Sequence, residues 1–469
     1  MRRARRVAIG VPAGFLARPA GFLRHPAGFL AEVEPSRRAS RKMRRAARFA
    51  SASALSCGQP RSSEASMHCK LLTAVVAGLL PFAAQAATID YKTAGDCDGF
   101  PAVSLATPPG VCVGLVATHL GFARGVAAID RDVYVVDMGG WGSHKGRLLR
   151  LADGGRGAPE VLMQGLFQPN AILPGPHRTL YLGVTGQVLQ VDPAARDVAA
   201  SARVVVANLP TTGRHPMPAL ALGADGALFV NVGSETDNCH GEDNAAPDPK
   251  AACPETQQKP PRGSVLRFAP RDTPWDASQQ APYALGLRNS MAMAVLADGR
   301  LVVAANARDG IHRVAPALAD AEFPHEPMAV LEPGADYGWP YCYDALVPSP
   351  EYPGFDCGKK HAPDLLLPAH AAPLGMILYR GDRLPGLHGK LVVGFHGYKP
   401  TGRRIVAIGL DGKSRPAGPP VDLVSGWDAV PDAHPQGAPL GLFELGDGSV
   451  LVTEDHNGSL LRVSAAKAR

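Results

Sequence analysis

A histidine just ahead of an apolar strand is the first candidate for chemistry in this chain. His215 lies in Gly213-Arg214-His215-Pro216, before the alternating apolar run at 220–222. Imidazole has a pKa close to neutrality, so a loop histidine that points into a cavity can take a proton as a general base. Taken alone, the segment is equally compatible with an exposed histidine that has no chemical role.

A second candidate site is the pair Arg288-Asn289, in Gly286-Leu-Arg-Asn-Ser ahead of the apolar run at 293–296. The guanidinium group is always charged and can donate two parallel hydrogen bonds to a carboxylate, and the neighbouring amide donates to carbonyl oxygens. The pair therefore suits an acidic, oxygen-rich ligand. A structural salt bridge is the alternative interpretation.

A third segment offers oxygen ligands. Asn306-Ala307-Arg308-Asp309 follows the apolar run at 301–305, and its side-chain and turn oxygens are hard ligands of the kind that Ca²⁺ takes. An Asx turn explains the same residues equally well.

Two further segments combine aromatic and cationic side chains. The run from Tyr337 to Tyr341, with Trp339 at its centre, can stack a planar ligand or cap an apolar core. His396-Gly-Tyr-Lys399 opens a polar, cationic hairpin whose alternative interpretation is a solvated loop.

These segments lie at the ends of strand-like runs that recur in six pairs. The pairs are 133–137 with 147–151, 180–184 with 187–192, 227–232 with 264–268, 301–305 with 311–314, 390–395 with 403–410, and 449–453 with 459–463. Asp-Gly turns punctuate the runs, which is typical of antiparallel strands. The repeat predicts an all-β fold, a six-bladed β-propeller of four-stranded antiparallel blades, whose channel brings distant residues together.

The amino-terminal part of the chain has a different composition. Residues 1–66 are a low-complexity Arg/Ala-rich segment that contains PAGFL three times. Residues 67–86 have the charged start, short apolar core and small-residue end of a signal peptide, with a membrane anchor as the alternative. Met67 is thus a candidate start, with residues 1–66 outside the native protein. The propeller is expected over residues 87–469.

The net charge excludes one class of partner. Residues 1–86 hold 15 of the 48 basic and 3 of the 42 acidic residues, so the remainder carries a net charge of −6 rather than the +6 of the whole chain. No nucleic-acid partner is expected. The apolar run at 71–82 is too short for a stable membrane span.

The cysteines indicate an oxidising compartment. Six of the eight lie in the expected propeller, as three couples 15, 14 and 15 residues apart. Their proximity predicts the disulfides Cys97–Cys112, Cys239–Cys253 and Cys342–Cys357, although six cysteines allow 15 pairings. There is no CxxC motif for zinc, thioredoxin-type redox chemistry or c-type haem. The protein is expected to be periplasmic or secreted.

Taken in order, the motifs resemble the glucose/sorbosone dehydrogenase family. The motifs are Arg214-His215, Gly286-Leu-Arg288-Asn289, Asn306-x-Arg308-Asp309, Gly338-Trp-Pro-Tyr-Cys342 and Phe395-His-Gly-Tyr398. These proteins are soluble six-bladed propellers that depend on pyrroloquinoline quinone (PQQ). The resemblance runs from about residue 114 to residue 463 and is strongest to the sorbosone or pyranose dehydrogenase branch.

The resemblance implies a role for each candidate. His215 would take the proton from a sugar hydroxyl as hydride passes to the quinone, and Arg288 would stabilise charge on the reduced quinone. The implied cofactor contacts are Arg288, Asn289, Trp339, His396 and Lys399. The implied surroundings of a Ca²⁺ ion are Asn306, Arg308, Asp309 and Tyr337.

The chain also departs from the family pattern at two positions. Ala438 stands where family members commonly have an arginine that contacts the cofactor, and Ser234 stands where the glucose-specific branch has an acidic residue. The expected activity is oxidation of an aldose or related sugar aldehyde to its lactone or acid, with an external quinone or cytochrome as electron acceptor. There are two alternatives, a non-catalytic carbohydrate-binding propeller and a metal-dependent sugar lactonase. The lactonase would need metal ligands, for which Glu235, Glu332 and Glu454 are poor candidates.

Overall fold

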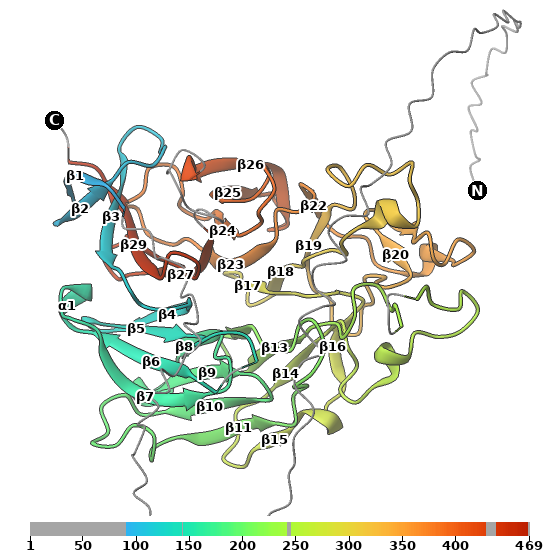
Figure 1. The fold of residues 1–469 in the computed structure, drawn as a ribbon, viewed down its shortest axis with the longest axis horizontal. Coiled ribbons are helices and arrows are strands. Elements are labelled where there is room, and N and C mark those ends of the chain that lie inside the picture. The colour runs from blue at the N-terminus through green and yellow to red at the C-terminus, as the bar shows by residue number, and fades with distance from the viewer. Residues whose placement is uncertain (1–90, 143, 242–244, 428–437, 468–469) are drawn as a thin grey trace, which may run out of the picture. The chain divides into compact units, whose positions relative to one another are not determined.

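The fold is a six-bladed β-propeller, as predicted (Figure 1). The computed structural model describes residues 91–142, 144–241, 245–427 and 438–467, so the expectations for residues 1–66 and 67–86 lie outside the described residues. In every blade the first strand is innermost, and these strands contact one another around a central channel.

Each blade is an antiparallel sheet of four consecutive propeller strands, with local additions. Blade 1 is β4 (Ala123–Ile129), β5 (Asp132–Asp137), β6 (Gly146–Leu151) and β7 (Glu160–Leu166). Blade 2 is β8 (Ala171–Pro174), β9 (Leu180–Val184), β10 (Gln187–Val191) and β11 (Arg203–Ala207), with β15 (Trp275–Asp276) at its edge. Blade 3 is β12 (Leu220–Leu222), β13 (Leu228–Val232), β14 (Ser264–Phe268) and β16 (Pro282–Leu285).

The second half of the propeller follows the same order. Blade 4 is β17 (Ala292–Val295), β18 (Leu301–Ala304), β19 (Glu326–Val330) and β22 (Leu365–Leu367). Blade 5 is β23 (Pro373–Leu378), β24 (Leu391–Phe395), β25 (Arg404–Leu410) and β26 (Pro416–Val424). Blade 6 is β27 (Pro439–Glu444), β28 (Val450–Glu454), β29 (Ser459–Ala465) and β3 (Val111–Ala117).

Blade 6 closes the ring by joining strands from both ends of the described chain. Its outer strand β3 precedes blade 1 in sequence but pairs with β29, the last strand. The edge is extended by β2 (Phe100–Val103) and β1 (Thr93–Cys97). These hydrogen bonds close the ring, because β3 continues along the chain into β4 of blade 1.

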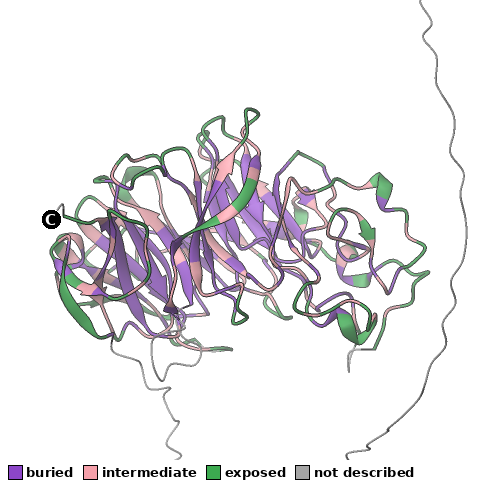
Figure 2. Ribbon diagram, turned by 90° about the horizontal axis from the view of Figure 1, so that it is seen from above, coloured by how far each residue is buried: buried purple, intermediate pink, exposed green. Residues whose placement is uncertain are grey.

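The apolar core is divided among the contacts between blades. Six buried clusters occur, each made of side chains from two neighbouring blades. In β18, for example, Val302 packs toward blade 5 whereas Val303 packs toward blade 3, since successive side chains point to opposite faces of a sheet. The strands are accordingly buried on both faces, and the exposed residues lie in loops and edges (Figure 2).

One predicted strand is wrong. Residues 311–314 do not pair with the run at 301–305, because Ile311–Arg313 form a short 3₁₀ helix after Gly310, whose φ is 59°. The left-handed turn at Gly310 directs the chain away from the sheet. The partner of β18 is instead β19. The other five pairs are the second and third strands of their blades.

All three predicted disulfides are present. Cys97–Cys112, Cys239–Cys253 and Cys342–Cys357 have Cα–Cα distances of 5.8, 5.9 and 6.1 Å. The last two tie the long segments between β13 and β14 and between β19 and β22, which carries the hairpin β20 (Cys342–Tyr343) and β21 (Val347–Pro348). Such disulfides are typical of an oxidising compartment. Within the described ranges, no helix is long and apolar enough to cross a membrane.

Candidate active site at the channel mouth

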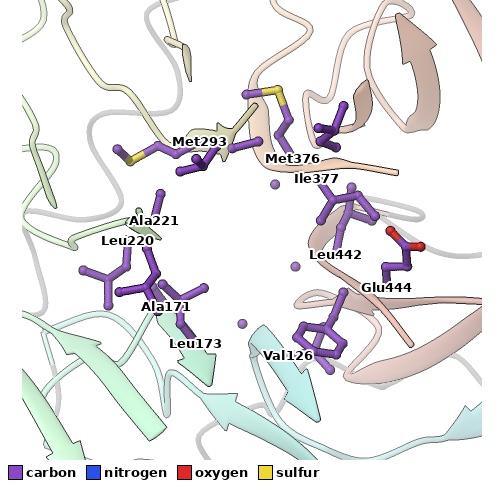
Figure 3. A pocket seen from close by; sticks show the side chains of 18 of the residues that line it. Val126, Ala171, Leu173, Leu220, Ala221, Met293, Met376, Ile377, Leu442 and Glu444 are labelled. Carbon is purple, nitrogen blue, oxygen red and sulfur yellow. The ribbon is translucent and has the colours of Figure 1, made fainter. Parts of the chain in front are cut away.

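The central channel is an apolar cavity of about 820 Å³. The first strand of each blade lines it, and Figure 3 shows Leu220, Met293, Met376 and Leu442 around the opening. Volumes of this size hold small-molecule ligands in many proteins. The lining itself offers few groups that could do chemistry.

A ring of polar side chains lies across one end of the channel, where the innermost strands begin. Arg124 near the start of β4 donates from Nε to Asn170 Oδ1 at 3.0 Å, and Asn170 donates to the carbonyl oxygen of Pro218 at 3.0 Å. Asn231 in β13 accepts from the next backbone N–H, that of Ala219. Blades 1, 2 and 3 are thereby joined at this end.

The ring continues through the other three blades. Asn231 donates to Asn289 at 3.3 Å, Asn289 to Asn306 at 3.2 Å, and Asn306 to the carbonyl oxygen of Pro373 at 3.0 Å. Pro373 starts β23 and pairs with the end of β24, directly before His396. His396 then bonds to Asp455, which pairs with Arg124 and closes the circuit. We call this end of the channel the mouth.

His215 lies at the mouth with a defined tautomer. Its Nδ1 is 2.8 Å from Ser234 Oγ and 3.2 Å from the Ser234 carbonyl oxygen. The Ser234 hydroxyl donates its own hydrogen to the carbonyl oxygen of Thr236 at 2.7 Å, so toward His215 it can only accept. Both partners of Nδ1 are acceptors; Nδ1 therefore carries the hydrogen and Nε2 has the free lone pair.

The charge of His215 follows from its surroundings. Its pKa is held well below the ordinary value of 6.5, first by burial and next by the positive charge of Arg288. His215 is therefore neutral at pH 7. Asn289 lies beside it, because a Cβ added at Gly233 would meet His215 Cβ at 2.5 Å and Asn289 Oδ1 at 2.9 Å.

Arg288 is buried and its guanidinium is occupied by protein partners. Nε donates to the carbonyl oxygen of Asp237 at 2.9 Å, and Nη2 to Asp237 Oδ1 at 2.6 Å. Nη1 donates to the carbonyl oxygens of Asn306 and Ala307 at 3.3 and 2.7 Å. Arg288 thus ties the loop after β13 to the loop after β18 and adds a fixed positive charge to the mouth.

The structure brings two of the four predicted metal residues to the mouth. Asn306 belongs to the polar ring, and the exposed Asp309 lies within 3.4 Å of Arg214 and 3.6 Å of Arg288. Behind them, Glu326 at the start of β19 accepts from the backbone N–H groups of Ala307 and Ala372. Burial raises the pKa of Glu326 to about 7.

The other two predicted metal residues, Arg308 and Tyr337, line a small pocket together with Asn306 and Arg288. The Arg308 guanidinium is buried against Glu351, which also accepts from His240 Nε2 at 3.1 Å. The Tyr337 hydroxyl donates to the carbonyl oxygen of Val330 and accepts from the N–H of Glu332. Both side chains have protein partners of their own, and the calcium surroundings stay a prediction.

The predicted cofactor residues also separate into two groups. Trp339 is buried, and its ring packs so closely on Gly263 that an added Cβ would lie 2.5 Å from it. By contrast, Asn289 and His396 belong to the polar ring. Lys399 is exposed, with its Nζ 3.8 Å from Asp320.

The motif analysis missed four members of the ring and one partner of Arg288: Arg124, Asn170, Asn231 and Asp455 in the ring, and Asp237 beside Arg288. Four of them were visible as polar residues within or directly next to apolar strands. Asp455 is fully buried; burial raises its pKa, but His396 and Arg124 outweigh burial and leave the pKa well below its usual range. Only Asp237, in a long loop, had no such signal.

The fold and the ring define a six-bladed propeller with a polar, histidine-bearing mouth. A family model described as Glucose / Sorbosone dehydrogenase matches residues 185–412, which include His215, Arg288 and His396. This match spans just under half of the chain and agrees with the family predicted from the sequence motifs.

Solved structures with the same architecture support the fold. The calcium structure of Trichoderma reesei Carbohydrate-Active Enzymes Family AA12 has a TM-score of 0.63 at 17% identity, covering 81% of this chain and 99% of that one. The holo form of the pyranose dehydrogenase PQQ domain from Coprinopsis cinerea has a TM-score of 0.61 at 18% identity, covering 78% and 99%. The PQQ-bound aldose sugar dehydrogenase from Streptomyces coelicolor has 0.53 at 17%, covering 77% and 100%. Two of these names are those of sugar dehydrogenases, although at these identities the likeness establishes the fold alone.

One curated relative is an uncharacterized protein of Borreliella burgdorferi, 28% identical over 190 residues. The match covers 38% of this chain and 48% of that protein, so the chain spans about half the length of the curated relative it matches.

Proposed function

We propose that the protein is an extracytoplasmic, PQQ-dependent dehydrogenase that oxidises an aldose or related sugar aldehyde to its lactone or acid. The observation that carries this proposal is the state of His215: neutral, hydrogen on Nδ1, and Nε2 with no hydrogen bond among the described residues. This is the state that a general base needs before it takes a proton from a substrate hydroxyl.

Each residue of the mouth has a defined part in the proposed reaction. Nε2 of His215 accepts the hydroxyl proton of the sugar, while Ser234 holds the ring in the required tautomer. Arg288, whose charge keeps His215 neutral before the reaction, also favours negative charge that develops beside it. A bound ortho-quinone supplies the two-electron acceptor for the hydride, which leaves the carbon atom that carries this hydroxyl group.

The donors at the mouth fit a planar quinone that carries carboxylate groups. Lys399 and Arg214 are 57% and 50% exposed and are held only loosely, 3.8 Å from Asp320 and 3.4 Å from Asp309. Such cations can turn toward carboxylates without breaking a buried pair. Asn289, His396 and Lys399 are the proposed contacts, whereas Trp339 would act only through packing.

Calcium fits the same site less well. The carbonyl oxygens of Asn306 and Ala307 accept from Arg288 Nη1, so a Ca²⁺ ion on those oxygens would lie beside the positive charge of a guanidinium group. We therefore derive no step through calcium.

Reconstitution of the purified protein tests the proposal. With PQQ, with and without added Ca²⁺, the protein should reduce a redox dye in the presence of at least one sugar from a panel of aldoses. Replacing His215 with Ala should lower turnover by about 10²–10⁴-fold, the usual contribution of a general base, while PQQ binding is retained. Loss of PQQ binding in this variant would contradict the assigned role.

The two alternatives give different outcomes. A carbohydrate-binding propeller would bind sugars without reducing the dye. A metal-dependent lactonase would hydrolyse sugar lactones, but the three carboxylates considered as poor ligand candidates have separate partners here: Glu235 bonds to Gln258, Glu332 to Arg415, and Glu454 to Tyr91. An external quinone or cytochrome as electron acceptor, and a periplasmic or secreted location, complete the proposal.

A further inference from the structure

Two histidines and a carboxylate converge at the rim of the mouth, on blades 5 and 6. His396 follows β24, and Asp455 and His456 follow β28. One ligand atom from each of the three residues lies within 4.8 Å of the others. His396 Nε2 is 2.9 Å from Asp455 Oδ1, and His456 Nε2 is 3.7 Å from the same oxygen.

These separations are those of ligands around one metal ion. Zinc binds imidazole nitrogen and carboxylate oxygen at about 2.0–2.2 Å, so neighbouring ligands in a tetrahedral site lie about 3.4 Å apart. The two measured separations fall on either side of that value. We propose that His396, Asp455 and His456 form a binding site for a divalent transition-metal ion of the zinc type.

The surroundings of the carboxylate hold it in place for this role. Its second oxygen, Oδ2, accepts from Arg124 Nη1 at 2.6 Å, and Arg124 is itself fixed by Asn170. A ligating carboxylate whose other oxygen is hydrogen-bonded in this way is a common arrangement around protein metal ions. Asp455 is 4% exposed, so its orientation is set by these contacts rather than by solvent.

The site is open on one side. The side chain of His456 is 27% exposed, and the hydroxyl of Tyr398, itself 55% exposed, lies 3.1 Å from His456 Nε2. An ion can therefore enter from solvent, and a fourth position remains for water or the phenol. Three protein ligands with one open position distinguish this arrangement from a closed structural zinc site.

The ligand types select the metal. Two imidazoles and one carboxylate suit zinc and the neighbouring transition metals, whereas calcium and magnesium prefer oxygen ligands throughout. Binding would replace the hydrogen bond between His396 Nε2 and Asp455, and His396 would then carry its hydrogen on Nδ1. The neighbouring Arg124 charge should make the affinity modest. Because His396 is also a proposed cofactor contact, the metal site is tested in the protein without cofactor.

Zinc titration of the chelator-treated full chain, without cofactor, tests the proposal by calorimetry. One Zn²⁺ ion should bind per chain, and His456→Ala should weaken binding by at least about tenfold. His388→Ala is the matched control, because His388 also lies 3.0 Å from a carboxylate, that of Asp382, but on an exposed surface with no third ligand. It should bind zinc as the parent does.

Cobalt gives a second readout that needs no substitution. Co²⁺ in the site should give visible absorption of the intensity expected for four or five ligands, and Zn²⁺ should abolish it. Absence of one-to-one zinc binding, equal affinity in His456→Ala, or a weak six-coordinate cobalt spectrum would each overturn the proposal.

Discussion

Blades 1 and 2 differ from blades 3 to 5 in where their charges lie. In blade 1 the pair Arg131–Asp153 joins two surface turns, with side chains 78% and 54% exposed. In the long-loop half of the molecule the pair Arg308–Glu351 is 3% and 1% exposed. In these examples the charges in the short turns of blade 1 are solvated, whereas those in the long loops of the second half are enclosed.

This difference indicates a role for the buried charges in the half of the molecule with the long loops, which we call the irregular half. A buried ion pair seldom stabilises a protein more than well-packed apolar residues would. Arg308–Glu351 and Arg288–Asp237 instead join loops that are far apart in sequence, and the second of these pairs lies at the mouth beside His215. These buried charges fix loop positions, so disturbing them should affect both folding and activity.

Breaking the buried pair is expected to have the largest effect on stability. Arg308→Ala leaves the Glu351 carboxylate buried without its partner, and such changes cost about 3–5 kcal/mol. The free energy of unfolding from chemical denaturation measures this. Arg131→Ala, which breaks the exposed pair, should change it by less than about 1 kcal/mol. Equal losses in the two variants would remove the contrast between the two halves.

A double variant sharpens the same comparison. Arg308→Met with Glu351→Leu removes both charges and keeps similar volumes. Because no charge is left buried, most of the stability lost in Arg308→Ala should return. If activity stays low while stability returns, the pair positions the loops for function.

Removing a disulfide should lower stability somewhat less than Arg308→Ala does. Its effect on activity should depend on where the disulfide lies. Closing a loop of 14 or 15 residues contributes about 3 kcal/mol in the chain-entropy model. Cys239→Ser with Cys253→Ser, near the mouth, should lower both stability and dye-linked activity. Cys97→Ser with Cys112→Ser, at the edge of blade 6, should lower stability alone, as thermal unfolding and activity assays would show.

The sequence was sufficient for the scaffold because the scaffold repeats. Alternating apolar runs and Asp-Gly turns predicted the middle strands of five blades, and cysteine proximity predicted three disulfides. The prediction was wrong at residues 311–314, where Ile, Val and a turn imitate a strand over a few residues. The true partner, β19, lies beyond a loop whose length no local pattern encodes.

The candidate site was harder to predict from the sequence, because its residues are far apart along the chain and come together only in the folded protein. Motifs singled out His215, Asn289 and His396, which the structure brings to the mouth. They could not show that Arg308 turns inward to Glu351, because Glu351 lies 43 residues further along the chain. Arg124 and Asp455, 331 residues apart, meet only when blade 6 closes on blade 1.

The smallest predicted effect concerns the tautomer of His215. Ser234→Ala removes one acceptor from Nδ1 but leaves the backbone oxygen at 3.2 Å, so turnover should fall only about fivefold, the loss of one hydrogen bond of roughly 1 kcal/mol. Because burial and Arg288 lower the pKa of His215, the folded state favours the neutral ring. Activity should accordingly be constant above pH 6.5 with respect to this group and decline only at lower pH, where protonation also reduces stability. Ser290→Ala is the control, since its buried hydroxyl has no hydrogen-bond partner among the described residues. An acid limb above pH 6.5, or an equal loss of activity in the control, would show that His215 is not held as the neutral base at the mouth of the irregular half.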